Sequence, residues 1–217
     1  TIIYNAVNLI NSRYKQLHLD KEKIPYDDEK AINIIKQGKT MGVFQLESSG
    51  MKRAIKVLKP SKFDDVVALV ALFRPGPMNF IPNYAKRKEG KEQIDCYDKR
   101  LEEILLPTYG ILTYQEQISS LAMVMSNFSP SEADNFRRAV SKKNKEIMEM
   151  MKSKFFVGAR QNNYPEHIIT RVFDDISKFA NYGFNKSHAV GYALIATRMA
   201  YLKAHYPAEF MAATMNS

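Results

Sequence analysis

The sequence predicts an all-α protein, and three observations support this fold class. Apolar residues recur roughly every 3.6 positions in its long segments, which is the spacing of amphipathic helices. Prolines and glycines interrupt this pattern at positions where helices would end. The chain contains no block of strand-forming residues, no internal repeat and no low-complexity segment. We therefore expect several helices packed around a hydrophobic core, without a sheet.

The first half of the chain favours short helices separated by turns. Residues 43–46 are expected to be extended, just before a helix that begins near Ser49. Ser61 is expected to cap the next helix, whose apolar residues face more than one side and therefore predict burial. Residues 89–106 are polar and weakly patterned, which predicts a surface excursion with one helical turn. The expected helices in this half are 1–16, 28–36, 49–58, 61–72 and 81–88.

The second half favours longer helices. Ser129 and Glu132 have the spacing of a capping box, with a proline at the first helical position between them. Ser187 is a good N-cap for a helix that should end before Pro207. The expected helices in this half are 113–127, 129–143, 145–161, 165–179, 187–205 and 207–215.

Length and composition indicate a globular protein with a basic surface. The 217 residues are 45% hydrophobic and 25% charged, enough for one large domain over residues 1–217 or for two halves, 1–106 and 107–217. The chain has 32 Lys and Arg against 23 Asp and Glu, a net charge of +9. This balance favours a polyanionic partner, and a solvated basic surface is the alternative explanation.

The residue counts also exclude some classes of protein and site. Cys96 is the single cysteine, which excludes a disulfide scaffold and a cysteine-rich zinc site and fits a reducing cytosol. The most apolar stretch, residues 189–202, contains Arg198 and is too interrupted to span a bilayer, so no membrane partner is expected. The chain starts at Thr1 without a signal segment, so we expect a cytoplasmic piece of a longer protein.

The first candidate site lies where the 187–205 helix begins. Free N–H groups and the positive end of the helix dipole make such a position favourable for a phosphate. A plain helix cap with core aromatic residues is the alternative. The residues placed around this helix end are Tyr182, Asn185, Lys186, Ser187 and His188.

The second candidate site lies near the end of the 129–143 helix. Arg138 and Lys142 are four residues apart and share one face, with Arg137 beside them and Lys143 following. We expect no acid to neutralise these cations, because Asp134 lies toward the opposite end of the helix. Arginine is suited to phosphate because its planar fork binds two oxygens. Solvated cations that match the helix dipole are the alternative.

Five runs of residues, in this order along the chain, resemble the α subunit of bacterial replicative DNA polymerase III, polymerase family C. The resemblance is closer to the type without an embedded exonuclease and covers essentially the whole chain. The runs are Val43-Phe44-Gln45-Leu46-Glu47-Ser48, Ala71-Leu72-Phe73-Arg74-Pro75-Gly76-Pro77, Pro107-Thr108-Tyr109-Gly110-Ile111 with Tyr114-Gln115-Glu116-Gln117, Tyr182-Gly183-Phe184-Asn185-Lys186-Ser187-His188, and Leu202-Lys203-Ala204-His205-Tyr206-Pro207-Ala208-Glu209-Phe210.

This resemblance implies that residues 1–217 are the multi-helix fingers domain that follows the palm. It implies that the helix carrying Arg137 and Arg138 lines the site of the incoming dNTP, and that residues 182–188 close the same pocket. The implied partners are primer–template DNA, the incoming dNTP, the palm and thumb of the same polymerase chain, and replisome subunits such as the sliding clamp through other regions.

Other basic residues are candidates for contacts with DNA. Arg74 ends a helix at a rigid Pro-Gly-Pro turn, where it can face the template or simply mark the helix stop. Lys86, Arg87 and Lys143 can follow phosphates by charge, although a solvated surface explains them as well. For residues 114–117 the sequence supports no role beyond packing and hydrogen bonding.

The sequence lacks the groups that carry out nucleotidyl transfer. That reaction uses two metal ions held by clustered carboxylates, whereas the acid pairs here are adjacent residues that point about 100° apart on a helix. The resemblance implies that the catalytic aspartates and Mg²⁺ belong to the palm. We therefore expect no cofactor on this chain, no activity from it alone, and DNA-directed DNA polymerase activity in the full-length protein.

Two hypotheses remain open at this point. One is the fingers domain of a replicative DNA polymerase, which positions the incoming dNTP and the template. The other is a non-catalytic basic helical module that binds nucleic acid or serves as a scaffold. Only the first requires Arg137, Arg138, Lys186 and His188 to converge on one concave face.

Overall fold

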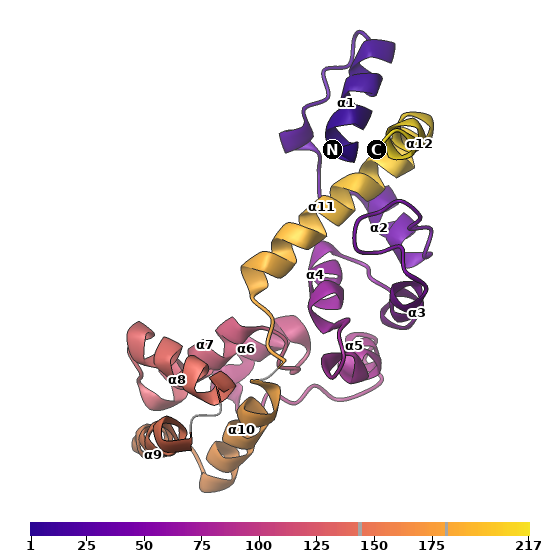
Figure 1. Ribbon diagram of the computed structural model, residues 1–217. Coiled ribbons are helices and arrows are strands. Elements are labelled where there is room, and N and C mark those ends of the chain that lie inside the picture. Colours follow the sequence, from indigo (N-terminus) through magenta and orange to yellow (C-terminus); the bar gives the residue numbers. More distant parts are fainter. Residues whose placement is uncertain (143–144, 181) are drawn as a thin grey trace. The chain divides into compact units, whose positions relative to one another are not determined.

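A computed structural model describes residues 1–142, 145–180 and 182–217, and over these residues the chain is all-α, as the sequence predicts. Over the described residues, twelve α-helices and four short 3₁₀ helices make up the regular structure (Figure 1). The one extended pairing recorded for the described residues is an isolated parallel bridge between Tyr114 and Phe184. None of the helices in these ranges has the length and apolar character needed to cross a membrane.

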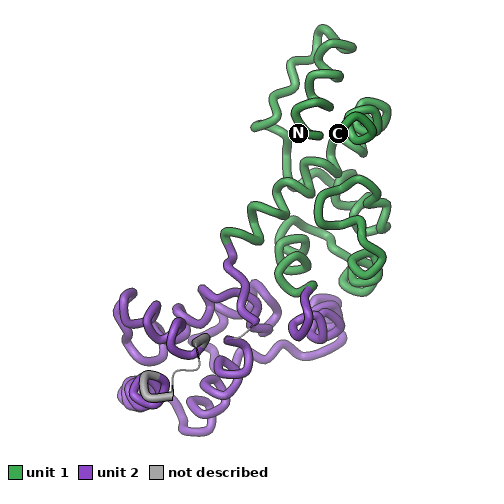
Figure 2. The backbone as a smooth tube through the Cα atoms, in the orientation of Figure 1, with its two compact units in different colours: residues 1–73, 187–217 green, residues 74–186 purple. Residues whose placement is uncertain are grey.

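The described residues form two compact units, coloured separately in Figure 2. The first unit contains Thr1–Phe73 and Ser187–Ser217, and the second contains Arg74–Lys186. The C-terminal segment joins the first unit because the last helix packs against the first helix of the chain. The unit boundaries therefore fall at residues 73/74 and 186/187, whereas the division considered from the sequence was near residue 106.

Two of the α-helices in the first unit begin at side-chain caps. The Asp28 carboxylate accepts the Ala31 N–H at 2.8 Å, and the Ser48 hydroxyl accepts the Met51 N–H at 3.2 Å. Both caps satisfy N–H groups that a helix start leaves without an internal partner. The elements of this unit are α1 (Ile2–Arg13), η1 (Lys21–Lys23), α2 (Glu29–Lys36), α3 (Ser49–Leu58), α4 (Phe63–Leu72), α11 (Lys186–His205, from Ser187 on) and α12 (Pro207–Met215).

Two local predictions in this unit were wrong. Residues 43–46 form turns rather than an extended segment, and Gln45 adopts a left-handed backbone conformation with φ of 63°. These turns bury Val43 and Leu46 together, whereas extended backbone would have pointed these two side chains, three positions apart, to opposite sides. Ser61 does not cap α4. Its N–H and hydroxyl instead donate to the buried Asp65 carboxylate at 2.8 and 3.0 Å, because that acid lies in the first turn of α4.

The second unit is a group of helices around an aromatic core, and Figure 1 shows α7, α8, α9 and α10 gathered together there. The Phe136 ring is fully buried and stacks on the Phe155 ring at 5.4 Å between centroids. The predicted capping box is confirmed, with Ser129 and Glu132 exchanging bonds of 2.9 and 3.3 Å. The elements of this unit are η2 (Pro77–Phe80), α5 (Ile81–Lys88), η3 (Lys99–Leu101), α6 (Glu102–Leu105), η4 (Leu106–Thr108), α7 (Gln115–Ser126), α8 (Pro130–Lys142), α9 (Lys145–Gln161) and α10 (Glu166–Phe179).

The prediction that residues 89–106 form a surface excursion was also wrong. Cys96, Leu101 and Leu105 are buried in the core cluster of the second unit, and the segment contains η3 and α6 rather than a single turn. Isolated apolar residues between polar ones carried too weak a periodic signal to indicate this burial.

Candidate functional site

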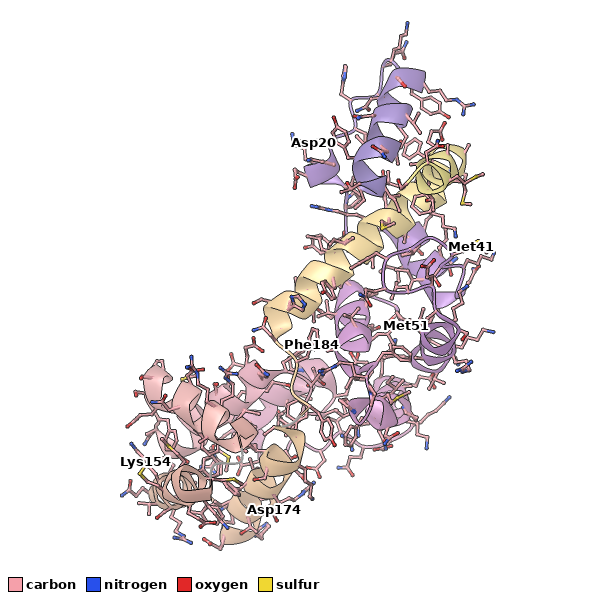
Figure 3. The ribbon with its side chains drawn as sticks, viewed as in Figure 1. Asp20, Met41, Met51, Lys154, Asp174 and Phe184 are labelled. Atoms are coloured by element: carbon pink, nitrogen blue, oxygen red, sulfur yellow. The ribbon has the colours of Figure 1, made fainter. Side chains whose placement is uncertain are left out.

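Residues 182–186, which lead into α11, are hydrogen-bonded to the chain at the start of α7. The Gln115 N–H donates to the Phe184 carbonyl oxygen at 2.9 Å, and the Phe184 N–H donates to the Thr113 carbonyl oxygen at 3.4 Å. Phe184 is labelled in Figure 3 on this segment. The two runs 113–115 and 182–186 therefore lie side by side, although almost 70 residues separate them in the sequence.

The first turn of α11 is capped by an acid from α7. Both oxygens of the Glu116 carboxylate lie close to the Lys186 N–H, at 3.0 and 3.1 Å, and one accepts the Asn185 side-chain amide at 2.8 Å. The prediction that Ser187 is the N-cap was therefore wrong, because α11 begins one residue earlier and receives its acceptor from another helix. A carboxylate thus occupies the helix end at which the sequence suggested a phosphate.

Ser187 and His188 follow in the same turn of α11. Both are exposed, and both are counted with the first unit, whereas Lys186 is the last residue of the second. The His188 ring lies 4.2 Å from the Tyr192 ring, centroid to centroid. The convergence of His188 with Arg137 on one face stays a prediction.

The arginines of α8 share one carboxylate. Asp134 accepts two hydrogen bonds from Arg137, at 2.6 and 3.1 Å, and its other oxygen lies 2.7 Å from Arg138 Nε. The expectation that no acid neutralises these cations was wrong, since residues three and four positions apart are neighbours on a helix. Arg137, with a smaller contribution from Arg138, holds the pKa of Asp134 below its usual value. Asp134 thereby orients both guanidinium groups.

Gln115 connects this arginine pair to the 182–186 segment. Its side-chain oxygen accepts a hydrogen bond from Arg137 Nη1 at 2.9 Å, and its side-chain nitrogen donates to the Gly183 carbonyl oxygen at 3.0 Å. The sequence indicated nothing specific about Gln115, because a surface glutamine at a helix start has no spacing that points to a distant partner. Two stretches predicted separately as nucleotide contacts are therefore joined through one side chain.

Arg74 and Gly76 lie against the same segment. Arg74 Nη2 donates to the Tyr182 carbonyl oxygen at 2.6 Å, and its guanidinium lies 4.5 Å from the centre of the Phe184 ring. Burial lowers the pKa of Arg74. Gly76 has a φ of 97°, and a Cβ there would lie 2.6 Å from a Tyr182 ring carbon, so glycine is required on both counts. Arg74, predicted as a DNA contact, is thus part of the same group as the predicted nucleotide contact Tyr182.

Among the other predicted DNA contacts, Arg87 lines the same cavity as Gly76 and Tyr182. Lys86 is exposed near the end of α5. Arg87 is held by Glu92 at 2.8 Å and by the Tyr109 carbonyl oxygen at 3.1 Å, which favours a structural role within the unit. The side chain of Lys142, at the end of α8, and the whole of Lys143 fall outside the described residues.

A cavity of about 490 Å³ in the second unit has Gly76 and Tyr182 on its wall. Charged residues that line the cavity have partners in the cavity wall. Arg171 forms an ion pair with Asp95, and Asp175 accepts a hydrogen bond from the Tyr97 hydroxyl at 2.9 Å. Burial, together with Asp175, raises the pKa of Tyr97. No group of three or more His, Cys, Asp or Glu side chains able to hold a metal ion occurs within the described ranges.

Comparisons with known proteins agree on one family. Residues 1–163 match the model of the bacterial DNA polymerase III alpha subunit finger domain. The chain is 48% identical to DNA polymerase III subunit alpha of Aquifex aeolicus over 197 residues, and 48% identical to that of Staphylococcus aureus strain Mu50 over 196 residues. Each alignment covers 90% of this chain but only 17% and 18%, respectively, of the relative.

Proposed function

The chain belongs to the bacterial DNA polymerase III alpha subunit finger-domain family, and on that premise we propose that it positions an incoming dNTP and the template during DNA synthesis. The triphosphate is bound by Arg137 and Arg138, with Lys142, Asn185 and Lys186 of the same unit as further contacts. Ser187 and His188, which follow in the chain, are proposed as nucleotide contacts as well. Tyr182 lies next to the base or sugar.

The observation that carries this proposal is the bridge that Gln115 makes between Arg137 and Gly183. Because of it, the fork that suits phosphate oxygens and the segment with Tyr182 belong to one hydrogen-bonded group. Tyr182 is 44% exposed and therefore accessible to a ligand. Asp134 and Glu116 already accept hydrogen bonds from Arg137 and from the Lys186 N–H, so a bound triphosphate competes with these carboxylates for the same donors.

The full-length protein is proposed to be a cytoplasmic DNA-directed DNA polymerase. Primer–template DNA, the dNTP, and the palm and thumb of the same chain are its partners, and the sliding clamp is reached through other regions. Arg74, Lys86, Arg87 and Lys143 are the proposed DNA contacts. Mg²⁺ and the catalytic aspartates belong to the palm, and we expect this chain alone to extend no primer.

Replacing Tyr182 by alanine in the full-length polymerase tests the pocket. The change removes a ring but no charge, so we expect altered selectivity among the four nucleotides and little change in the affinity for the triphosphate. Steady-state incorporation of correct and incorrect nucleotides on a primed template measures both. An unchanged selectivity would place the ring outside the pocket.

Replacing Lys86 by alanine tests contact with the DNA backbone. If Lys86 neutralises one phosphate, DNA affinity falls and the slope of log affinity against log salt decreases by about one. Fluorescence anisotropy with primed DNA at several salt concentrations measures the slope. Lys91→Ala is the matched control, since Lys91 is paired with Glu89 in the same unit. Equal slopes for wild type and Lys86→Ala would favour a solvated surface.

A further inference from the structure

We infer that Gln115 is a positioning residue for the incoming nucleotide, because it fixes the guanidinium of Arg137 against the 182–186 segment. The inference rests on the proposed function and assigns a specific task to a residue outside the proposed ligand contacts. Gln115 belongs to the run 114–117, for which the sequence supported no such role.

The orientation of the Gln115 amide is determined by its partners. Arginine has only donors, so the side-chain oxygen must face Arg137; the Gly183 carbonyl has only acceptor capacity, so the side-chain nitrogen must face Gly183. The amide satisfies both partners in one orientation, and reversing it would leave two repulsive contacts. Because the Gln115 amide has one allowed orientation, it holds the Arg137 guanidinium at one distance from the Gly183 carbonyl group.

The bridge is supported on both sides. On α8, Arg137 is held from its other edge by Asp134, so the guanidinium lies between a carboxylate and the Gln115 amide. On the other side, the Gln115 N–H donates to the Phe184 carbonyl oxygen, next to the residue that receives the side-chain bond. The backbone and the side chain of one residue therefore grip the segment at consecutive carbonyl groups.

The neighbouring Glu116 continues this connection. Its carboxylate accepts from the Asn185 side chain and the Lys186 N–H, the next positions of the same segment. Two successive residues at the start of α7 thus hold four successive residues of the segment in register with Arg137. If the Arg137 guanidinium were not held in place, it would stabilise the incoming nucleotide less, because catalysis depends on charges that are already fixed where the reacting group needs them.

The test uses the full-length polymerase carrying Gln115→Leu, which keeps the bulk of the side chain and removes both side-chain bonds. We expect the kcat/KM for dNTP incorporation to fall about 5- to 30-fold, with the affinity for primed DNA unchanged. Gln93→Leu makes the same chemical change at an exposed glutamine of the same unit and should behave as wild type.

Gln115→Glu separates the two bonds. It keeps an acceptor for Arg137, but a carboxylate oxygen then faces the Gly183 carbonyl oxygen, which replaces the bond to the segment by a repulsive contact. We therefore expect kcat/KM to fall at least as far as in Gln115→Leu, because Arg137 is no longer held against the segment. If Gln115→Glu keeps the wild-type kcat/KM, the bond to Gly183 does not position Arg137 and the inference is overturned. This comparison also holds if Gln115→Leu lowers the stability of the enzyme.

A double-mutant cycle gives the decisive readout. In an Arg137→Ala background, Gln115→Leu should change kcat/KM by less than about twofold, because the group that it positions is already absent. A full additional loss in that background would overturn the inference, as would a Gln115→Leu enzyme with wild-type kinetics. If Arg137→Ala itself leaves dNTP kinetics unchanged, the proposed function fails; if only the Gln115 variant is silent, the proposed function stands and the positioning role falls.

Discussion

Replacing Arg137 or Arg138 by alanine in the full-length polymerase should lower the efficiency of dNTP incorporation about 10- to 150-fold. Each change removes charge-assisted hydrogen bonds to the triphosphate worth roughly 1.5–3 kcal/mol, and every 1.36 kcal/mol corresponds to about tenfold in rate. The loss should appear in the KM for dNTP or in kcat, while the affinity for primed DNA changes little. Steady-state incorporation on a primed template, run beside a DNA-binding assay, measures these quantities.

The two arginines should not be equal in this experiment. Arg137 is held by Asp134 and Gln115, whereas the Arg138 side chain is 62% exposed and is paired with Asp134 alone in the recorded contacts. A pre-positioned cation loses less freedom when a ligand binds, so we expect the larger effect at Arg137. Arg160→Ala is the matched control, because it removes an exposed arginine paired with Glu166 elsewhere in the unit.

A loss of DNA affinity with unchanged dNTP kinetics would contradict the pocket assignment. In that case Arg137 and Arg138 serve the template strand, and the basic helical nucleic-acid-binding module becomes the better description of this chain.

Replacing Phe136 by alanine should destabilise the second unit by about 3–5 kcal/mol, the usual loss for a buried phenylalanine. Its side chain is fully buried, stacks on Phe155 and meets Phe128 edge-on at 5.7 Å, so the truncation leaves a cavity between these two rings. Hydrogen exchange of the α8 and α9 amides in the full-length protein measures the local free energy of opening.

Phe80→Ala controls for the loss of an aromatic ring as such, because Phe80 is in the same unit and 49% exposed. It should change the free energy of opening of α8 and α9, measured by hydrogen exchange, by no more than about 0.5 kcal/mol. Similar protection in the two variants would mean that Phe136 does not hold α8 and α9 together.

The sequence by itself determined the helices and the family. The sequence predicted α9 at Lys145–Gln161 with both ends correct, because the helical segment is long and polar residues flank it in the sequence. The capping box at Ser129 was also predictable, since its two bonds lie within four residues of one another. Even the pairing of Arg137 with Asp134 was within reach, because the i,i+3 spacing is a local property of a helix.

Only the tertiary structure decided which acceptors and donors meet across long separations. Glu116 caps α11 and Gln115 joins Arg137 to Gly183, although 70 and 68 positions separate the partners of the Glu116–Lys186 and Gln115–Gly183 bonds. Such contacts follow from the docking of the 182–186 segment beside the start of α7, which no periodicity encodes. The prediction that Ser187 is the N-cap of α11 failed for the same reason. Ser187 has a suitable side chain for a cap, but the acceptor at the helix start is the Glu116 carboxylate of α7, whose position depends on the tertiary structure.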